Sequence, residues 1–202
     1  MRTLYTVLWY IVWPFFSLFH PCRLAGREHL PSGGGLFCGN HSALNDPICL
    51  MMAAGPKHQM RAMAKAEFMN LPVLGWLLRK VGMFGVERGK SDMSAIKTAI
   101  KYLKSGENVL MFPEGTRIKD GVDKYGNHSE AHPGAAMLAV RTGAPLVPVY
   151  IPQKKRWFRF TTIVIGEPYH PQVEGQWGSA EEYQAVAGDL LKRIYALAER
   201  EA

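Results

Sequence analysis

The stretch Gly35-Leu36-Phe37-Cys38-Gly39-Asn40-His41-Ser42-Ala43-Leu44-Asn45-Asp46-Pro47 joins an apolar run to the start of a helix. The run Gly35–Cys38 is typical of a buried strand, and Asp46-Pro47 is typical of a helix N-terminus. Strand ends of this kind are where α/β chains tend to place their chemistry. The sequence therefore predicts a functional loop between a strand and a helix.

Two side chains of this loop suit acid–base chemistry. Histidine is the side chain best suited to act as a base near neutral pH, and Asp46 follows His41 by five residues. If the loop folds back, the carboxylate accepts a hydrogen bond from one ring nitrogen and fixes the tautomer and orientation of the ring. A plainer interpretation makes Asp46 a helix N-cap and His41 an ordinary loop residue. The stretch alone leaves both interpretations open.

The composition is that of one folded domain with a basic balance. The chain has 202 residues, of which 48% are apolar and 20% charged, and a formal net charge of +7. This length supports a substantial core, and the charge favours an anionic partner such as a phosphate-bearing substrate, an acidic membrane face or nucleic acid. Cys22, Cys38 and Cys49 cannot all pair and lack C-x-x-C spacing, so they are predicted to be reduced, mostly buried thiols.

The segment from Leu4 to Phe19 is uncharged and rich in aromatic side chains. It is shorter than the about 20 apolar residues of a membrane span and contains Pro14. Residues 19–23 do not form the small-residue cleavage site of a secretory signal. Because Trp and Tyr favour the headgroup level, we expect residues 1–21 to form a membrane-interface helix, with a plain core helix as the alternative.

From residue 22 onward strand-like and helix-like segments alternate, which predicts an α/β domain over 22–202 with a mostly parallel central sheet flanked by helices. The expected strands cover residues 24–29, 36–38, 59–64, 83–86, 108–112, 146–151 and 157–165. The expected helices cover residues 47–54, 67–79, 91–105, 133–141 and 180–199. We expect a break at Pro72, an edge position for 157–165, and an edge position or bulge at Pro148.

Four short motifs occur in order along these segments. They are Asn40-His41-x-x-x-x-Asp46, Gly82-Met83-Phe84-Gly85-Val86-Glu87-Arg88, Phe112-Pro113-Glu114-Gly115-Thr116-Arg117 and Val147-Pro148-Val149-Tyr150-Ile151. Their order and spacing resemble the motifs of the glycerolipid acyltransferases, specifically the 1-acylglycerol-3-phosphate (lysophosphatidate) acyltransferase family. The resemblance runs from about Leu24 to Ile165 and includes Lys65-x-Glu67-Phe68. It departs from the family pattern at Ala131-His132-Pro133, where a Phe-Lys-type pair is usual.

The resemblance implies an acyltransferase that moves an acyl group from acyl-CoA or acyl-acyl-carrier-protein to the 2-hydroxyl of 1-acylglycerol 3-phosphate, giving phosphatidate. His41, oriented by Asp46, is expected to act as general base without an acyl-enzyme. Glu114 completes the expected catalytic set by accepting a hydrogen bond from the substrate glycerol or from Arg117. The turn 113–115 would offer a backbone N–H to the oxyanion.

Cationic side chains near the motifs are predicted to bind the phosphate of the acceptor. Arg88 can contact a phosphate bidentately, and Lys65 and Arg117 are the expected helpers. Gly115 and Thr116 complete the expected substrate-binding set. Arg88 and Lys65 each have an alternative as an ordinary solvated charge.

Two other chemistries are not expected. Cys38 precedes His41 by three residues, but a strand places the two on opposite faces, which argues against a thiol nucleophile. His128 and His132 are four residues apart, but Pro133 indicates a loop, so neither a metal site nor a cofactor is expected.

The expected partners are the lysophosphatidate and acyl thioester substrates and a membrane surface, with acyl carrier protein as an alternative acyl donor. The basic aromatic run 154–159 could also bind RNA, but together with the aromatic segment 4–19 it favours lipid headgroups, so no nucleic acid is expected. The expected location is the cytoplasmic face of the cell membrane, peripheral or monotopic.

The acyl chain is expected to lie in an apolar groove lined by the first helix and the apolar side chains of residues 68–77, which could equally be core. Two alternatives to this function remain. The nearer is a different acceptor, such as glycerol 3-phosphate or another lysophospholipid. The more distant is a non-catalytic lipid-binding protein of the same fold.

Overall fold

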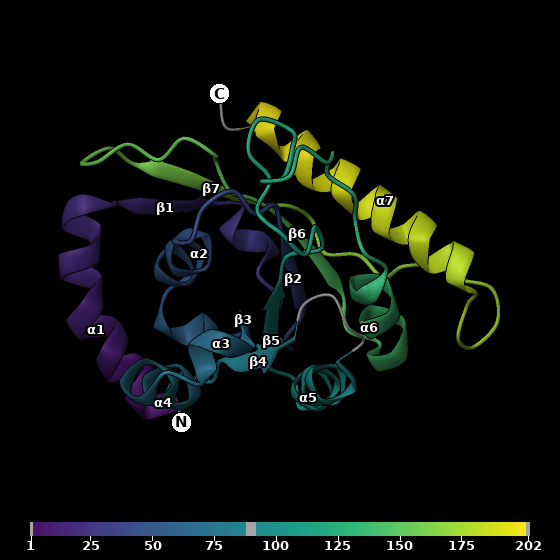
Figure 1. Ribbon diagram of the computed structural model, residues 1–202, viewed down its shortest axis with the longest axis horizontal. Helices are drawn as coiled ribbons and strands as arrows, with labels where there is room; N and C mark the ends of the chain where they lie inside the picture. The colour runs from purple at the N-terminus through teal and green to yellow at the C-terminus, as the bar shows by residue number, and fades with distance from the viewer. Residues whose placement is uncertain (1, 88–91, 201–202) are drawn as a thin grey trace.

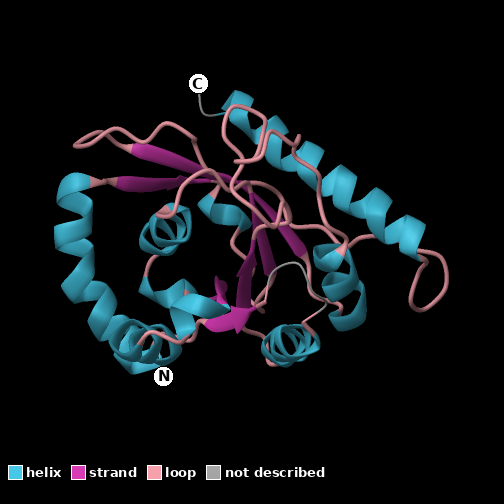
Figure 2. Ribbon diagram, viewed as in Figure 1, coloured by secondary structure: helices cyan, strands magenta, loops and turns pink. Residues whose placement is uncertain are grey.

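The computed structural model describes residues 2–87 and 92–200, in which a seven-stranded sheet lies between helices (Figures 1 and 2). The strands are β1 (Cys22–Ala25), β2 (Leu36–Gly39), β3 (Met60–Lys65), β4 (Phe84–Val86), β5 (Asn108–Met111), β6 (Leu146–Tyr150) and β7 (Thr161–Ile165). Their order in the sheet is β1-β7-β6-β2-β5-β3-β4. Each neighbouring pair is parallel except β6 with β7. The predicted mostly parallel α/β sheet is confirmed.

The helices begin and end close to the positions that the sequence predicts. They are α1 (Arg2–Phe19), α2 (Asp46–Ala54), α3 (Ala66–Met69), α4 (Pro72–Lys80), α5 (Met93–Lys104), α6 (Gly134–Thr142) and α7 (Ala180–Ala196). The predicted break at Pro72 separates α3 from α4. The Asp92 side chain caps α5 by accepting backbone N–H bonds, and Ser179 with Glu182 forms a capping box at the start of α7.

Alternate residues of the central strands face two separate hydrophobic clusters. Phe37 of β2 packs in a cluster with α2, whereas its neighbours Leu36 and Cys38 pack in a cluster with α5, α6 and α7. Figure 1 shows the same division, with α1 and α2 on one side of the sheet and α5, α6 and α7 on the other. Both faces of β2 are therefore buried, as expected for a central parallel strand.

The sequence-based prediction is wrong about the positions of β6 and β7. β7 begins only at Thr161, and it lies between β1 and β6 rather than at an edge. β6 is internal too, although it contains Pro148. The Pro148 carbonyl accepts a hydrogen bond from Gly166 N–H, so the missing N–H of the proline also faces β7. The register between β6 and β7 is only two residue pairs long, Val149 with Ile165 and Tyr150 with Val164, so the missing N–H of Pro148 falls just beyond that ladder.

The first strand also differs from its prediction over 24–29. β1 stops at Ala25, and a 3₁₀ turn occupies Arg27–His29. Gly26 between them has a φ of 74°, and a Cβ on it would lie 2.2 Å from the Ile165 carbonyl oxygen. The tight approach of β7 therefore ends the strand at a position that only glycine can occupy.

The first helix, α1, leaves much of its apolar surface exposed, although it continues through Pro14. Phe16 packs against the α2 cluster. At the end of the helix, the Phe19 ring contacts the rings of Trp157 and Phe158. None of the helices in the described part of the chain has the length and hydropathy needed to span a bilayer.

Candidate active site

The site lies at the carboxyl edge of the central strands β2, β5 and β6. β2 pairs in parallel with both of its neighbours, so the three strands end at the same edge. After β2 the chain enters α2 on one face of the sheet, whereas the helix that follows β5, α6, packs on the other face. In open α/β sheets this divergence marks the place where ligands bind.

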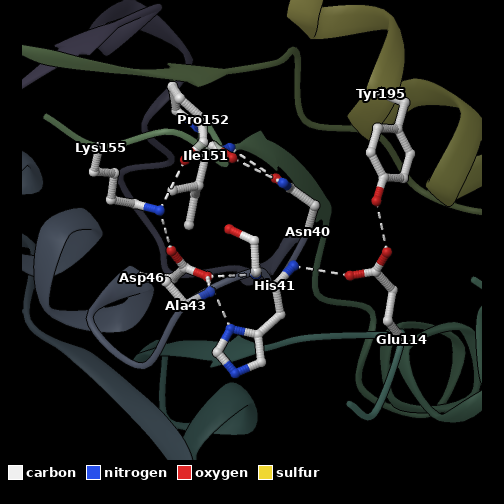
Figure 3. A network of polar contacts seen from close by, with 10 residues as sticks. Asn40, His41, Ala43, Asp46, Glu114, Ile151, Pro152, Lys155 and Tyr195 are labelled. Atoms are coloured by element: carbon white, nitrogen blue, oxygen red, sulfur yellow. Dashed lines mark hydrogen bonds and ion pairs between the residues drawn. The ribbon is translucent and has the colours of Figure 1, made fainter. Parts of the chain in front are cut away.

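His41 and Asp46 form a buried hydrogen-bonded pair in the loop between β2 and α2 (Figure 3). His41 Nδ1 lies 3.0 Å from Asp46 Oδ2, and the two side chains are 8% and 0% exposed. Oδ2 also accepts the backbone N–H groups of Ser42 and Ala43 at 2.6 and 2.7 Å. The carboxylate therefore folds back onto its own loop and does not cap α2, so the plainer interpretation of Asp46 is wrong.

The environment of Asp46 keeps it ionised. Burial opposes ionisation, but the hydrogen bond with His41, the charge of Lys155 and the N–H of Ala43 together lower the pKa of the carboxyl below its usual value. A carboxylate can only accept, so His41 Nδ1 is the nitrogen that carries the proton.

The other ring nitrogen of His41, Nε2, is the one available to a substrate. Among the described residues no hydrogen bond to Nε2 is found, and Figure 3 shows it pointing away from Asp46. The ring is also stacked on Phe112, with centroids 4.2 Å apart and planes inclined by 19°. The imidazole is thus fixed in orientation with the lone pair of Nε2 unused.

The main chain of this loop is anchored to the two neighbouring strands. The Asn40 amide donates to the Ile151 carbonyl at 2.8 Å and accepts from Ile151 N–H at 2.7 Å, just beyond β6. The His41 carbonyl accepts from Ile118 N–H at 2.7 Å, in the chain beyond β5. These bonds satisfy buried polar groups and leave the loop little freedom to move.

Glu114 contacts the backbone of His41. Its Oε2 accepts His41 N–H at 2.8 Å, and its Oε1 accepts the hydroxyls of Ser129 at 2.6 Å and Tyr195 at 2.7 Å. Of the two donors predicted for Glu114, the substrate glycerol or Arg117, the second is not among these partners, and the Arg117 side chain is exposed. Both carboxylate oxygens therefore have partners within the protein, and one of them holds the backbone of the loop that carries His41.

The turn after β5 depends on glycine. Gly115 has a φ of 65°, and a Cβ on it would lie 2.8 Å from the His132 ring. Its own N–H donates to the Phe112 carbonyl at 3.0 Å and closes the turn. Thr116 is half-buried next to it. The Gly115 amide, one of those in the turn predicted to face the oxyanion, is therefore already bonded within the protein.

Of the predicted phosphate ligands, Lys65 lies at the end of β3. Its side chain is 42% exposed and forms an ion pair with Glu67 at 2.7 Å. Its register partner is Val86 of β4, two residues before Arg88 in the sequence. Arg88 itself lies outside the described residues.

Sequence reasoning missed three side chains of the site: Lys155, Ser129 and Tyr195. Lys155 belongs to the basic run assigned to the membrane, yet its side chain is only 5% exposed and its ammonium lies 2.5 Å from Asp46 Oδ1. Ser129 comes from the irregular segment between β5 and α6, and Tyr195 from the last turn of α7. None of them belongs to a local motif that would have marked it.

The cysteines agree with their prediction as free, mostly buried thiols. Cys38 lies in the cluster on the α6 and α7 face, away from the Phe112 side on which the His41 ring stacks. Burial raises the pKa of its thiol. His128 and His132 lie in irregular chain, as predicted, and no group of three metal-ligating side chains was found in the described residues.

The site combines an ionised carboxylate, a fixed imidazole with one unused nitrogen and a position at the carboxyl edge of an open sheet, an arrangement that is chemically capable of general-base catalysis. A family model described as Acyltransferase matches residues 22–152. The chain therefore belongs to the acyltransferase family, which confirms the resemblance seen in its motifs.

Individual relatives agree with this assignment. A 1-acyl-sn-glycerol-3-phosphate acyltransferase of Bacillus subtilis is 33% identical over 181 residues, which are 87% of this chain and 87% of the relative. A lyso-ornithine lipid O-acyltransferase of Pseudomonas aeruginosa is 35% identical over 95 residues, 46% of this chain and 34% of the relative. The crystal structure of the 1-acyl-sn-glycerophosphate (LPA) acyltransferase PlsC from Thermotoga maritima, 24% identical, matches the fold with a TM-score of 0.68 over 100% of this chain and 80% of that one.

Proposed function

We propose that this protein transfers an acyl group from acyl-CoA or acyl-acyl-carrier-protein to the 2-hydroxyl of 1-acylglycerol 3-phosphate, giving phosphatidate. The observation that carries the proposal is the His41–Asp46 pair at 3.0 Å with an unused Nε2. Membership of the acyltransferase family supports the reaction class. The similarity to the Bacillus subtilis acyltransferase over most of both chains supports the acceptor.

In the proposed reaction His41 Nε2 takes the proton of the 2-hydroxyl as that oxygen attacks the thioester carbonyl. The tetrahedral intermediate then collapses, the carbon–sulfur bond breaks, and the imidazolium returns the proton to the leaving thiolate. Asp46 stabilises the imidazolium between these steps. The acyl carbon passes directly from the thioester sulfur to the 2-hydroxyl oxygen, so the mechanism contains no acyl-enzyme.

Cationic side chains are proposed to bind the phosphate of the acceptor. Arg88 and Lys65 would supply the main charges, and Arg117, Gly115 and Thr116 would line the same end of the site. The partner of Lys65 is an exposed carboxylate, and such a pair contributes little to stability. An incoming phosphate can therefore replace Glu67 at low cost.

Exposed apolar side chains near His41 support a lipid substrate. Leu44, between His41 and Asp46, is 64% exposed, and Ile48 on the first turn of α2 is 37% exposed. Further exposed apolar residues follow on α3 and α4, namely Phe68, Leu71, Val73, Leu74 and Trp76. We propose that these side chains, with α1, contact the acyl chains and the surrounding lipid.

Membrane association is proposed for the same side of the protein. Residues 1–21 would form an interfacial helix on the domain 22–202, and the exposed rings of Trp157, Phe158 and Phe160 would enter the headgroup layer at the cytoplasmic face. Sedimentation with anionic vesicles and with oligonucleotides tests this location. Tight RNA binding without vesicle binding would refute it.

The activity is tested by measuring thiol release from acyl-CoA and acyl-acyl-carrier-protein, with and without lysophosphatidate. We expect release that depends on the acceptor, its abolition in His41→Ala, and retention of most activity in folded Cys38→Ala. An active His41→Ala together with an inactive Cys38→Ala would overturn the assignment of the base. An absence of thiol release with every donor and acceptor would favour the non-catalytic lipid-binding alternative.

A second candidate acceptor comes from the lyso-ornithine lipid relative, whose named substrate differs from that of the Bacillus protein. The acceptor panel therefore includes a lyso-ornithine lipid, glycerol 3-phosphate and other lysophospholipids. A preference for acceptors without phosphate would contradict the proposed role of Arg88 and Lys65.

A further inference from the structure

Lys155 is a buried cation in a segment whose neighbouring charges are exposed. Its side chain is 5% exposed, whereas Lys154 and Arg156 are both exposed. The ammonium lies 2.5 Å from Asp46 Oδ1 and donates a hydrogen bond to the Pro152 carbonyl at 2.8 Å. A buried ammonium is costly unless it is paired and hydrogen-bonded, and here both conditions are met by groups at the active site.

The two oxygens of Asp46 have different partners. Oδ2 faces the His41 ring and the N–H groups of Ser42 and Ala43, and Oδ1 faces Lys155 (Figure 3). Rotation of the carboxylate would break contacts at both oxygens. Lys155 therefore restrains the oxygen that orients the imidazole, although it does not touch the ring itself.

The ammonium also changes the charge that the imidazole experiences. A lone carboxylate beside an imidazole favours the protonated ring, which cannot act as a base. A cation on the far side of the carboxylate offsets part of that charge, and in a buried site the effect is weakly screened.

We propose that Lys155 is a positioning residue of the acyl transfer, acting through Asp46 to set both the orientation of His41 and the pH above which the ring is an active base. This inference rests on the proposed function, because it assumes that His41 is the base. It assigns to the buried lysine a role that the exposed members of the basic run do not share.

Other titratable groups lie near the Asp46–Lys155 pair, and their effects on the pH profile must be distinguished from the effect of Lys155. The charges of Asp46 and Lys155 both act on the pKa of the Cys49 thiol on α2, and the charge of Lys155 acts on that of Cys22 on β1. The hydrogen bond with Cys49 lowers the pKa of the Cys22 thiol, which burial opposes and the lysine charge assists. Glu114 contacts His41 from the opposite side, through the backbone N–H. A Cys22→Ser background removes the more acidic thiol from the pH profile.

The experiment measures kcat/KM for thiol release against pH in the wild type, Lys155→Met and Lys101→Met. Lys101 is an exposed lysine on α5, so its variant loses the same charge away from the site. We expect the acid limb of the kcat/KM profile to lie about one pH unit higher in Lys155→Met than in the wild type. At pH values below the limb the variant should then be about tenfold less active than the wild type, and at pH values above the limb it should recover part of that loss. Lys101→Met and Cys22→Ser should leave the limb unmoved.

The proposal is overturned if Lys155→Met loses activity by the same factor at every pH, or if its profile superimposes on that of the wild type. Lys155→Gln, checked for folding by circular dichroism, repeats the test with a polar side chain. Unfolding of both neutral variants would also overturn it, in favour of a purely structural ion pair. Titration of the His41 ring by NMR gives the same comparison without turnover, so the inference can fail separately from the proposed reaction.

Discussion

Two buried carboxylates contact His41 from opposite sides, and their partners differ in kind (Figure 3). Asp46 bonds the ring and is backed by the ammonium of Lys155. Glu114 bonds the backbone N–H and is backed by the neutral hydroxyls of Ser129 and Tyr195. One carboxylate is thus coupled to groups whose charge affects the ring, and the other is coupled to groups that stay neutral.

This difference predicts two separate roles, an effect of Asp46 on the proton transfer and an effect of Glu114 on the position of the loop. A change on the Asp46 side alters the charge felt by the imidazole while a proton moves, so it should act on kcat and on the pH profile. A change on the Glu114 side alters the location of the loop, so it should act on stability and on activity without moving the profile. Variants on each side test whether the two sides separate in this way.

The largest effect is expected for Asp46→Asn. The neutral amide cannot stabilise the imidazolium, and its NH₂ group must face either the Lys155 ammonium or the N–H donors of Ser42 and Ala43. We expect kcat to fall on the order of 10³-fold in steady-state thiol release, with the fold retained. A loss smaller than about tenfold would remove Asp46 from the catalytic set.

A smaller effect is expected at Glu114, and it should depend on the replacement. Glu114→Ala leaves the buried His41 N–H without an acceptor, so we expect about 1–3 kcal/mol less stability in urea unfolding and a kcat lower by about 10- to 100-fold. Glu114→Gln keeps an acceptor for that N–H and can donate to the Ser129 and Tyr195 oxygens, so its loss should stay within about fivefold.

The Gln variant decides the role of this carboxylate. If Glu114→Gln is as damaging as Glu114→Ala, the negative charge itself matters, and a direct substrate contact as expected from the motif becomes the better explanation. Tyr195→Phe tests what the Tyr195 hydroxyl contributes through Glu114, and Tyr125→Phe in an exposed loop is its control.

The smallest effect is on stability in acid. The pKa of Asp46 is lowered in the folded state, so its contribution is fully present above the unfolded value of about 4 and is lost as the pH falls through the lower folded value. We expect the Tm of the wild type to fall a few degrees further between pH 6 and pH 3 than that of Asp46→Asn. Other acid-sensitive groups such as Asp92 are present in both proteins and affect both in the same way. Parallel curves of Tm against pH would therefore show that Asp46 contributes nothing to the acid sensitivity.

Features with local causes were predictable from the sequence. The break between α3 and α4 follows from Pro72, whose ring disrupts a continuing helix. The pairing of His41 with Asp46 was visible because five residues of loop suffice to bring the two side chains together. The alternation of strands and helices similarly predicted the sheet and its two buried faces.

Features that depend on strand order were not predictable. The internal position of β7 comes from its pairing with β1, which lies at the other end of the sequence. Pro148 is accepted inside the sheet because one neighbouring ladder is short, a fact that no local pattern contains. Lys155 is buried because the chain after β6 brings it against Asp46 at the start of α2, and Tyr195 bonds Glu114 across 81 residues of sequence.

The bond from Tyr195 to Glu114 has a consequence for synthesis. His41 and Asp46, the proposed base and its partner, emerge from the ribosome long before Tyr195 does. A nascent chain shorter than 195 residues therefore lacks one of the two hydroxyls that bind Glu114 and, through it, His41. The loop that holds His41 therefore acquires its full set of hydrogen bonds only after α7 has docked on the sheet.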